Sequence, residues 1–151
     1  MTLTTGDDAP TVTAPNQDGE AVSPAFDDPT VVYFYPHDDT PGCTTEATQF
    51  QRERETYREA GVEVYGVSTD DVASHSSFAQ SEALEFDLLA DPDGEVADAF
   101  GVDVTDGTAP RTTFVLADGE IRAVYENVDP DGHAREVLLD ALDDDLVTLP
   151  E

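Results

Sequence analysis

The sequence holds one cysteine, one methionine, no tryptophan and no lysine in 151 residues. A single cysteine excludes any disulfide within the chain, and with it the small secreted folds that disulfides hold together. The longest apolar run, Val31–Tyr35, is about five residues, whereas a membrane-spanning helix needs roughly 18 or more. The first ten residues are acidic and lack the basic and apolar segments of an export signal. We therefore expect a soluble protein of a reducing compartment, the cytoplasm.

Positive charge is also scarce. The chain carries 35 acidic residues against six arginines, which gives a formal net charge of −29. Such a charge is typical of disordered chains when hydrophobicity is low. Here the apolar residues make up 38% and recur with strand and helix periods, which favours a folded domain with an acidic surface. We interpret that surface as halophilic, because about 1 M salt shortens the screening length to about 3 Å. It disfavours nucleic acids and anionic membranes as partners.

The order of the patterns predicts an α/β fold with a central mixed sheet flanked by helices and an N-terminal hairpin, in a single domain over 1–151. Two further short helices are predicted from their caps. One follows the cap-rich start at Ser68–Asp71. The other has Asp91 as its N-cap, Pro92 at the first helical position and Gly101 at its end. The other predicted elements are a hairpin over Val12–Val22, strands at Val31–Tyr35, Val62–Val67 and Phe86–Ala90, a helix over Thr44–Ala60, a hairpin of Thr112–Leu116 with Ile121–Tyr125 turning at Asp118–Gly119, and a final helix over Ala134–Leu142.

Cys43 lies at the junction between a buried strand and a helix. A turn rich in proline and glycine separates Tyr35 from the helical pattern, which begins at the sulfur. The unpaired N–H groups at a helix N-terminus favour thiolate over thiol. Most lone cysteines are small core hydrophobes, but glycine, threonine and aspartate surround this one. We therefore interpret Cys43 as a nucleophile.

The residues around Cys43 resemble those of a known family. The pattern P-x-x-x-T-x-x-C, formed by Pro36, Thr40 and Cys43, resembles the active-site signature of peroxiredoxins, which are thiol peroxidases with a thioredoxin-like fold. The longer run from Tyr35 to Ala47 is similar to the bacterioferritin-comigratory-protein (Q-type) subfamily. Further matches, which extend the resemblance over nearly the whole chain, are Gly66–Ser68, Ser74–His75, Asp91–Gly94 and Arg111–Val115.

The resemblance implies a role for each of four residues. Cys43 reduces hydrogen peroxide or an organic hydroperoxide and becomes a sulfenic acid. Arg111 and the Thr40 hydroxyl, with the Cys43 backbone N–H, bind the peroxide oxygens, and Pro36 shields the thiolate. A lowered thiol pKa alone accelerates the attack only a few-fold, because nucleophilicity falls with basicity. Positioning and charge stabilisation must therefore supply most of the acceleration.

Two positions depart from the subfamily pattern. Many members carry a second, resolving cysteine five residues after the first, where this chain has Thr48. We therefore predict a one-cysteine cycle with an external thiol or a thioredoxin-like protein as reductant, in a monomer that needs no cofactor and no metal. His37 stands where lysine is common, and we expect no catalytic role for it.

Other interpretations of the same residues are weaker. Glu46 near the helix start fits a scaffold role, and Arg111 could be a structural ion-pair residue in so acidic a chain. His37, His75 and His133 are widely spaced and are expected to be capping or surface residues rather than metal ligands. Ser68, Asp70 and His75 suggest a triad, but no G-x-S-x-G motif occurs.

Two alternative functions remain open from the sequence. One is a peroxide sensor or holdase-type protein that Cys43 oxidation switches without turnover, and the other is a thioredoxin-like module that only binds partners.

Overall fold

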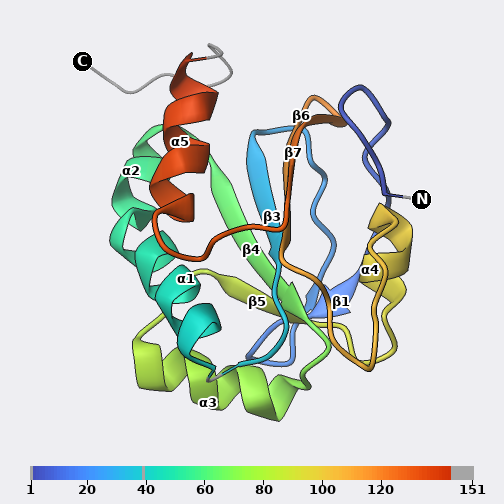
Figure 1. The fold of residues 1–151 in the computed structure, drawn as a ribbon, viewed down its shortest axis with the longest axis vertical. Coiled ribbons are helices and arrows are strands. Elements are labelled where there is room, and N and C mark those ends of the chain that lie inside the picture. Colours follow the sequence, from blue (N-terminus) through green and yellow to red (C-terminus); the bar gives the residue numbers. More distant parts are fainter. Residues whose placement is uncertain (1, 39, 144–151) are drawn as a thin grey trace.

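In the computed structural model, which describes residues 2–38 and 40–143, helices cover both faces of a five-stranded mixed sheet (Figure 1). The strands are β1 (Ala14–Pro15), β2 (Ala21–Val22), β3 (Thr30–Phe34), β4 (Glu63–Ser68), β5 (Asp87–Ala90), β6 (Thr112–Ala117) and β7 (Glu120–Glu126), and the helices are α1 (Pro41–Arg52), α2 (Arg54–Glu59), α3 (Val72–Glu82), α4 (Glu95–Phe100) and α5 (His133–Asp143). The predicted α/β class is confirmed.

The sheet order is β5-β4-β3-β6-β7, with β1 and β2 paired in a separate small sheet. β3 is parallel to β4, β4 is parallel to β5, and β6 is antiparallel to both β3 and β7. The central strand, β3, therefore has one parallel and one antiparallel neighbour. This arrangement places the loop after β3 beside the loop after β4 and beside the residue that precedes β6.

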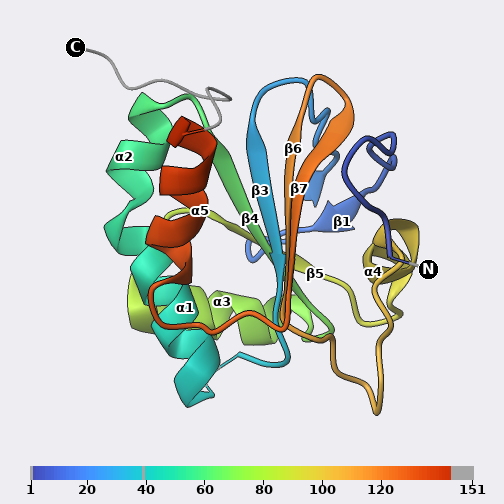
Figure 2. The ribbon, with the colours of Figure 1, turned by 45° about the horizontal axis from the view of Figure 1, so that its top comes forward.

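Two hydrophobic cores lie on opposite faces of the sheet, and β3 contributes to both. Val31 and Tyr33 pack in the core under α1, α2, α3 and α5, whereas Val32 and Phe34 pack in the core under α4. Figure 2 shows α1, α2 and α5 on one side of the sheet and α4 on the other. A strand buried on both faces reads as a continuous apolar run, which is why this strand was predictable.

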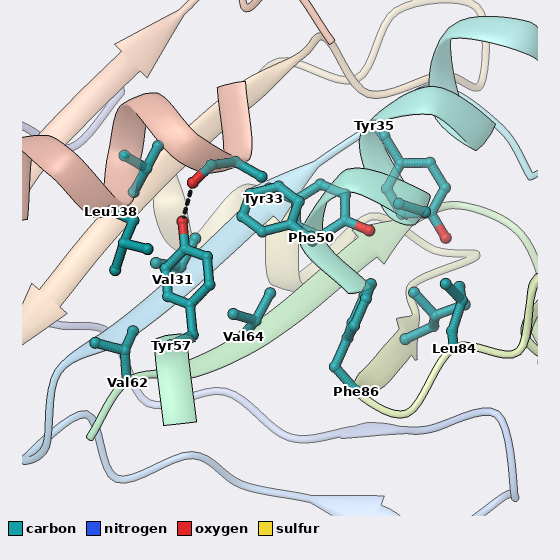
Figure 3. Packing of buried hydrophobic residues seen from close by; sticks show 14 of the residues in the cluster. Val31, Tyr33, Tyr35, Phe50, Tyr57, Val62, Val64, Leu84, Phe86 and Leu138 are labelled. Atoms are coloured by element: carbon teal, nitrogen blue, oxygen red, sulfur yellow. Dashed lines mark hydrogen bonds between the residues drawn. The ribbon is translucent and has the colours of Figure 1, made fainter. Parts of the chain in front are cut away.

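The core under α1 is rich in aromatic side chains (Figure 3). Tyr33 stacks on Phe50 of α1 with ring centroids 4.6 Å apart. The hydroxyl of Tyr57 donates a hydrogen bond to the carbonyl oxygen of Ala134, so α2 is tied to the first turn of α5. These contacts hold α1, and with it Cys43, against the sheet.

Several predicted boundaries are corrected by the structure. The predicted helix over Thr44–Ala60 is two helices, α1 and α2, separated at Glu53, and it begins three residues earlier, at Pro41. The predicted hairpin over Val12–Val22 contains strands of only two residues each. The strands predicted at Val31–Tyr35 and Val62–Val67 are shifted by one residue at both ends, and the strand predicted at Phe86–Ala90 begins one residue later.

Turn and cap residues behave largely as their chemistry predicts. Asp71 caps α3, because its side chain accepts a hydrogen bond from the Ser74 N–H at 2.8 Å. Asp118 and Gly119 turn the β6–β7 hairpin with φ of 55° and 74°. Gly101 ends α4 with φ of 72°.

The start of α4 was predicted wrongly. This helix begins at Glu95 rather than Pro92, and Gly94 is its N-cap residue. The Asp91 carboxylate nevertheless accepts hydrogen bonds from the N–H groups of Val96 and Ala97, so it caps the helix from a distance.

Among the described residues, no helix is long and apolar enough to cross a membrane.

Candidate active site

Cys43 is the third residue of α1, directly after the loop that leaves β3. Thr40 is the N-cap residue in an extended conformation, and Pro41 occupies the first helical turn. Proline is favoured there because its missing N–H would have no partner in the helix. The first helical hydrogen bond runs from the Thr44 N–H to the Thr40 carbonyl at 2.9 Å. The N–H groups that precede it, including that of Cys43, have no partner within the helix. The helix N-terminus therefore stabilises negative charge on the sulfur.

Arg111, the residue directly before β6, contacts the sulfur of Cys43. Its Nη2 lies 3.3 Å from Cys43 Sγ and its Nη1 lies 3.0 Å from Glu46 Oε1. Because β6 pairs with β3, a residue 68 positions after the cysteine lies over the start of α1. The structure thus brings Cys43 and Arg111 together. Cys43 is only 1% exposed, while the Arg111 side chain is 19% exposed.

Gly42 makes room for the guanidinium. A Cβ atom at this position would lie 2.6 Å from Arg111 Nη2, the same nitrogen that contacts the sulfur. Real Cβ contacts are essentially never that short. Glycine before the cysteine therefore allows the close approach of Arg111.

Glu46 lies one helical turn after Cys43 and forms a buried ion pair with Arg111 at 1% exposure. Burial raises the pKa of Glu46 to about 7, although the charge and hydrogen bond of Arg111 act in the opposite direction. Its Oε1 accepts the hydrogen bond from Arg111, whereas Oε2 has no hydrogen-bond partner among the described residues. Glu46 therefore holds one edge of the guanidinium while the other edge faces the sulfur.

Thr40 and Pro36 are also placed near the helix start. The Thr40 hydroxyl donates a hydrogen bond to the His37 carbonyl oxygen at 3.2 Å. Pro36 is partly exposed in the loop between β3 and α1. The peptide bond before Pro110 is trans, like the others described, so Arg111 follows an ordinary backbone. The catalytic roles of Thr40 and Pro36 stay predictions.

The three histidines lie in different surroundings, one exposed and two buried. His37 is exposed and lies 3.3 Å from an Asp70 carboxylate oxygen. His75 and His133 are buried, at 0% and 2% exposure, so of the two predicted roles, capping or surface, the surface one was wrong for both. His133 Nε2 lies 2.8 Å from the Thr113 hydroxyl.

The suggested triad is also absent, because its histidine faces a different carboxylate. The Ser68 hydroxyl donates to Asp70 at 2.7 Å, but Nδ1 of His75 lies 2.8 Å from Asp38.

Two features of the site escaped the sequence. The pairing of Glu46 with Arg111 joins residues 65 positions apart, and only the antiparallel partnership of β3 and β6 brings them together. The spacing of Cys43 and Glu46 by three residues on a helix did signal a shared face. The buried environment of His75 had no comparable signal.

Comparisons with known proteins find similarity over most of the chain. Residues 5–124 match the model of the AhpC/TSA family. The chain is similar to the peroxiredoxin bcp of Coxiella burnetii, with 41% identity over 150 residues that cover 91% of this chain and 98% of the relative. It is 43% identical to the chloroplastic peroxiredoxin Q of Oryza sativa subsp. japonica, covering 88% of this chain and 64% of that protein. Among solved structures it is similar to the bacterioferritin comigratory protein of Xanthomonas campestris, whose title describes alkyl peroxide reduction, with TM-score 0.85, 29% identity and coverage of 93% and 98% of the two chains.

Proposed function

Because this chain belongs to the AhpC/TSA family and is a thiol-dependent peroxidase with a thioredoxin-like fold, we propose that Cys43 is its nucleophile and Arg111 its main charge-stabilising group. The observation that carries the proposal is the 3.3 Å contact between Arg111 Nη2 and Cys43 Sγ at the start of α1. Removing the sulfur tests it, since Cys43→Ser eliminates the only thiol of the chain.

In the oxidative step, the Cys43 thiolate attacks one oxygen of the hydroperoxide. The S–O bond forms as the O–O bond breaks, so sulfur is oxidised to sulfenic acid and the peroxide is reduced. The distal oxygen leaves with the bonding electrons and takes up a proton, which yields water from hydrogen peroxide or an alcohol from an organic hydroperoxide. Arg111 stabilises the negative charge that moves from sulfur to this departing oxygen.

The Thr40 hydroxyl is available to orient the substrate. It donates to His37 in this structure, and a hydroxyl oxygen keeps lone pairs that can accept from the O–H of a hydroperoxide. Glu46 is a positioning residue in this scheme, because it touches Arg111 rather than the substrate. Pro36 limits access of water to the sulfur from the loop side.

In the reductive step, an external thiol attacks the sulfenic acid and releases water, which leaves a mixed disulfide on Cys43. A second thiol then reduces the mixed disulfide and regenerates the Cys43 thiol, and the two external sulfurs end in a disulfide. Thr48 occupies α1 and bonds to the carbonyl oxygens of Thr44 and Thr45, so it offers no sulfur to this step. Since Cys43 is 1% exposed, the first turn of α1 must open before a bulky thiol can reach it.

The decisive experiment follows the single sulfur by mass spectrometry. After one equivalent of hydroperoxide, a sulfenic-acid trap should add once, at Cys43, and a low-molecular-weight thiol should give a Cys43 mixed disulfide. Arg111→Ala should slow formation of the sulfenic acid without removing the thiol. An intact protein mass with neither adduct after peroxide treatment would exclude the proposed cycle.

Continuous turnover separates the peroxidase from the peroxide-sensor or holdase alternative, which the relatives do not favour. A peroxidase consumes many equivalents of hydroperoxide when thiol is supplied. A sensor consumes one equivalent and stops.

The environment of the protein is part of the proposal. The net charge of −29 supports a salt-rich setting, a monomer, and partners other than nucleic acid or membrane. The single cysteine supports the reducing cytoplasm, and the length of 151 residues supports a single domain over 1–151. We expect turnover and stability to rise together with salt up to molar concentrations, because screening weakens the repulsion among surface carboxylates. Unchanged activity and stability between dilute buffer and molar salt would argue against this setting.

A further inference from the structure

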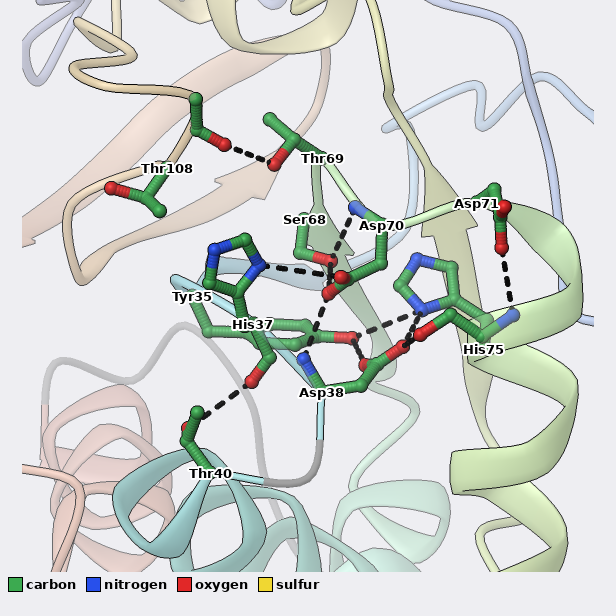
Figure 4. A network of polar contacts seen from close by, with 12 residues as sticks. Tyr35, His37, Asp38, Thr40, Ser68, Thr69, Asp70, Asp71, His75 and Thr108 are labelled. Atoms are coloured by element: carbon green, nitrogen blue, oxygen red, sulfur yellow. Dashed lines mark hydrogen bonds and ion pairs between the residues drawn. The ribbon is translucent and has the colours of Figure 1, made fainter.

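A buried polar network surrounds Asp38 in the β3–α1 loop (Figure 4). It joins this loop to the β4 side of β3, whereas Arg111 comes from the β6 side. The Asp38 carboxylate accepts hydrogen bonds from the Tyr35 hydroxyl at 2.7 Å and from the Ser74 hydroxyl at 2.8 Å. Its backbone N–H donates to the Asp70 carboxylate at 2.8 Å. The Asp38 side chain is 2% exposed. The loop that precedes Cys43 is thus fastened to the end of β4 and the start of α3.

His75 completes the network from the first turns of α3. Its Nδ1 lies 2.8 Å from Asp38 Oδ2, and its Nε2 lies 3.0 Å from the carbonyl oxygen of Leu89 in β5. A carbonyl oxygen only accepts, so Nε2 must carry a proton. Nδ1 faces the Asp38 carboxylate on a ring with no exposed surface, and a proton at this nitrogen donates a hydrogen bond to a charged acceptor. Such charge-assisted hydrogen bonds are stronger than neutral ones.

The electrostatics of Asp38 agree with this geometry. Burial raises the pKa of Asp38, but the hydrogen bond and charge of His75, with the hydrogen bonds from Tyr35 and Ser74, outweigh burial and lower it overall. The carboxylate is therefore ionised at neutral pH and available to accept a hydrogen bond from His75.

The same three side chains, Asp38, Asp70 and His75, have ligand atoms within 4.8 Å of one another, a spacing that also suits a metal ion. Their atoms are already engaged with each other and with hydroxyl groups. Asp70 Oδ2 accepts from Ser68 and from the Asp38 N–H, and Asp38 Oδ2 accepts from Ser74 and faces His75. The hydrogen-bond network accounts for this cluster better than a cation does.

The first turn of α1 lies between two attachments. On one side Arg111 and Glu46 hold the sulfur, and on the other side Asp38 holds the chain two residues before the N-cap Thr40. Opening of this turn is required for a bulky thiol to reach Cys43, which is 1% exposed. Local opening depends on the contacts that must break, and the bonds of Asp38 are buried polar contacts on this side.

From this arrangement we infer that the Asp38–His75 pair is a positioning element for the reductive step: it sets how often the first turn of α1 opens and admits an external thiol to Cys43. The inference rests on the proposed function for its physiological meaning. The opening itself is measurable without any peroxide chemistry.

The direct test uses a bulky aromatic disulfide, 5,5′-dithiobis(2-nitrobenzoic acid), on the reduced full-length chain in molar salt. With one cysteine in the chain, the released thiolate reports exchange at Cys43 alone. Asp38→Ala and His75→Ala should each accelerate this exchange by roughly 10- to 100-fold, the range expected from loss of a hydrogen bond to a charged group. The double variant should be no faster than the faster single variant, because the two residues act as one pair.

Three further variants separate this effect from a general loss of stability. Asp91→Ala removes another buried, hydrogen-bonded carboxylate, one that caps α4 instead of holding the loop, and should leave the exchange rate unchanged. His75→Asn returns a donor near the Nδ1 position and should slow the exchange relative to His75→Ala. Ser74→Ala removes one hydrogen bond to Asp38 at a partly exposed residue and should accelerate the exchange less. This variant tests the inference if Asp38→Ala and His75→Ala do not fold.

The two half-reactions supply an independent readout. In Asp38→Ala, oxidation of Cys43 by hydroperoxide should slow, because the Arg111 contact is populated less, while attack of an external thiol on the sulfenic acid should accelerate. An exchange rate within twofold of the unmodified chain, or an equal acceleration in Asp91→Ala, overturns the inference. Absence of peroxide turnover in the unmodified chain would instead refute the proposed function and leave the exchange result standing.

Discussion

Glu46 offers the sharpest quantitative prediction, because a single substitution removes its titration while preserving its shape. Glu46→Gln replaces a buried carboxyl by an amide whose oxygen can still accept the hydrogen bond from Arg111 Nη1, observed at 3.0 Å. The amide nitrogen takes the place of Oε2, which has no partner among the described residues. The guanidinium should therefore keep its contact with Cys43.

The magnitude follows from the pKa of Glu46, which burial raises from 4.5 to about 7. Between these values the folded chain holds a proton that the unfolded chain has released. Folding stability from this group is therefore fully present below pH 4.5 and is lost as pH rises to about 7. At about 1.4 kcal/mol for each pH unit, the loss across the interval is about 3 kcal/mol.

Urea unfolding in molar salt, carried out on both proteins at several pH values from about 4.5 to about 7.5, measures this loss. In the difference between the unfolding free energies of the two proteins, the contributions of the other carboxyl groups cancel. The unfolding free energy of Glu46→Gln should therefore rise by about 3 kcal/mol relative to that of the unmodified chain over the interval. Glu59→Gln, at an exposed position of α2, controls for removal of one negative charge. A difference for Glu46→Gln that stays constant across the interval would refute the reasoning, since it would mean that Glu46 is already ionised at acidic pH in the folded protein.

Three other substitutions follow from the same geometry. Arg111→Ala should lower the rate of peroxide reduction by about 10²- to 10³-fold, the usual loss for a group that stabilises transition-state charge. Stopped-flow oxidation of Cys43 measures this rate. An equal loss in the double variant Arg111→Ala with Glu46→Gln would exclude an indirect effect of an unpaired carboxylate. Gly42→Ala should displace Arg111 Nη2, because this nitrogen would lie 2.6 Å from the new Cβ. Oxidation of Cys43 should then slow by about tenfold or more. An unchanged rate would show that the guanidinium has another productive position. Gly66→Ala places a Cβ 2.9 Å from the Tyr33 ring and hydroxyl and from Leu88. Thermal unfolding should therefore show a loss of about 1–3 kcal/mol in unfolding free energy, with little change in activity at low temperature. Retained stability would contradict the tight packing.

Much of the fold could be predicted from local patterns. The continuous apolar run of β3, the Asp118–Gly119 turn and the amphipathic α5 were all readable, because burial on both faces, positive φ and helical periodicity leave direct marks in the sequence. The break at Glu53 left no such mark. The helical pattern runs through residues 44–60, whereas the backbone divides into α1 and α2.

The start of α1 shows a signal that was present but underused. Thr40 followed by Pro41 fits an N-cap and first-turn pair, yet the predicted helix began at Thr44. At α4 the reverse occurred, because Asp91 and Pro92 suggested a cap pair while the carboxylate caps N–H groups five and six residues away. Capping side chains can act across a turn, so their sequence position alone does not locate the first helical residue.

The sequence by itself determined the chemistry at the start of α1: a lone thiol after a Pro- and Gly-rich turn, with a strand before it and a helix after it. Local backbone preferences act over a few residues, and they suffice for that arrangement. Only the tertiary structure decided which distant groups surround the thiol, namely Arg111 and Glu46 on one side and the Asp38–His75 pair on the other. Strand pairing and burial select these partners, because they join residues tens of positions apart and decide which charges lose their water.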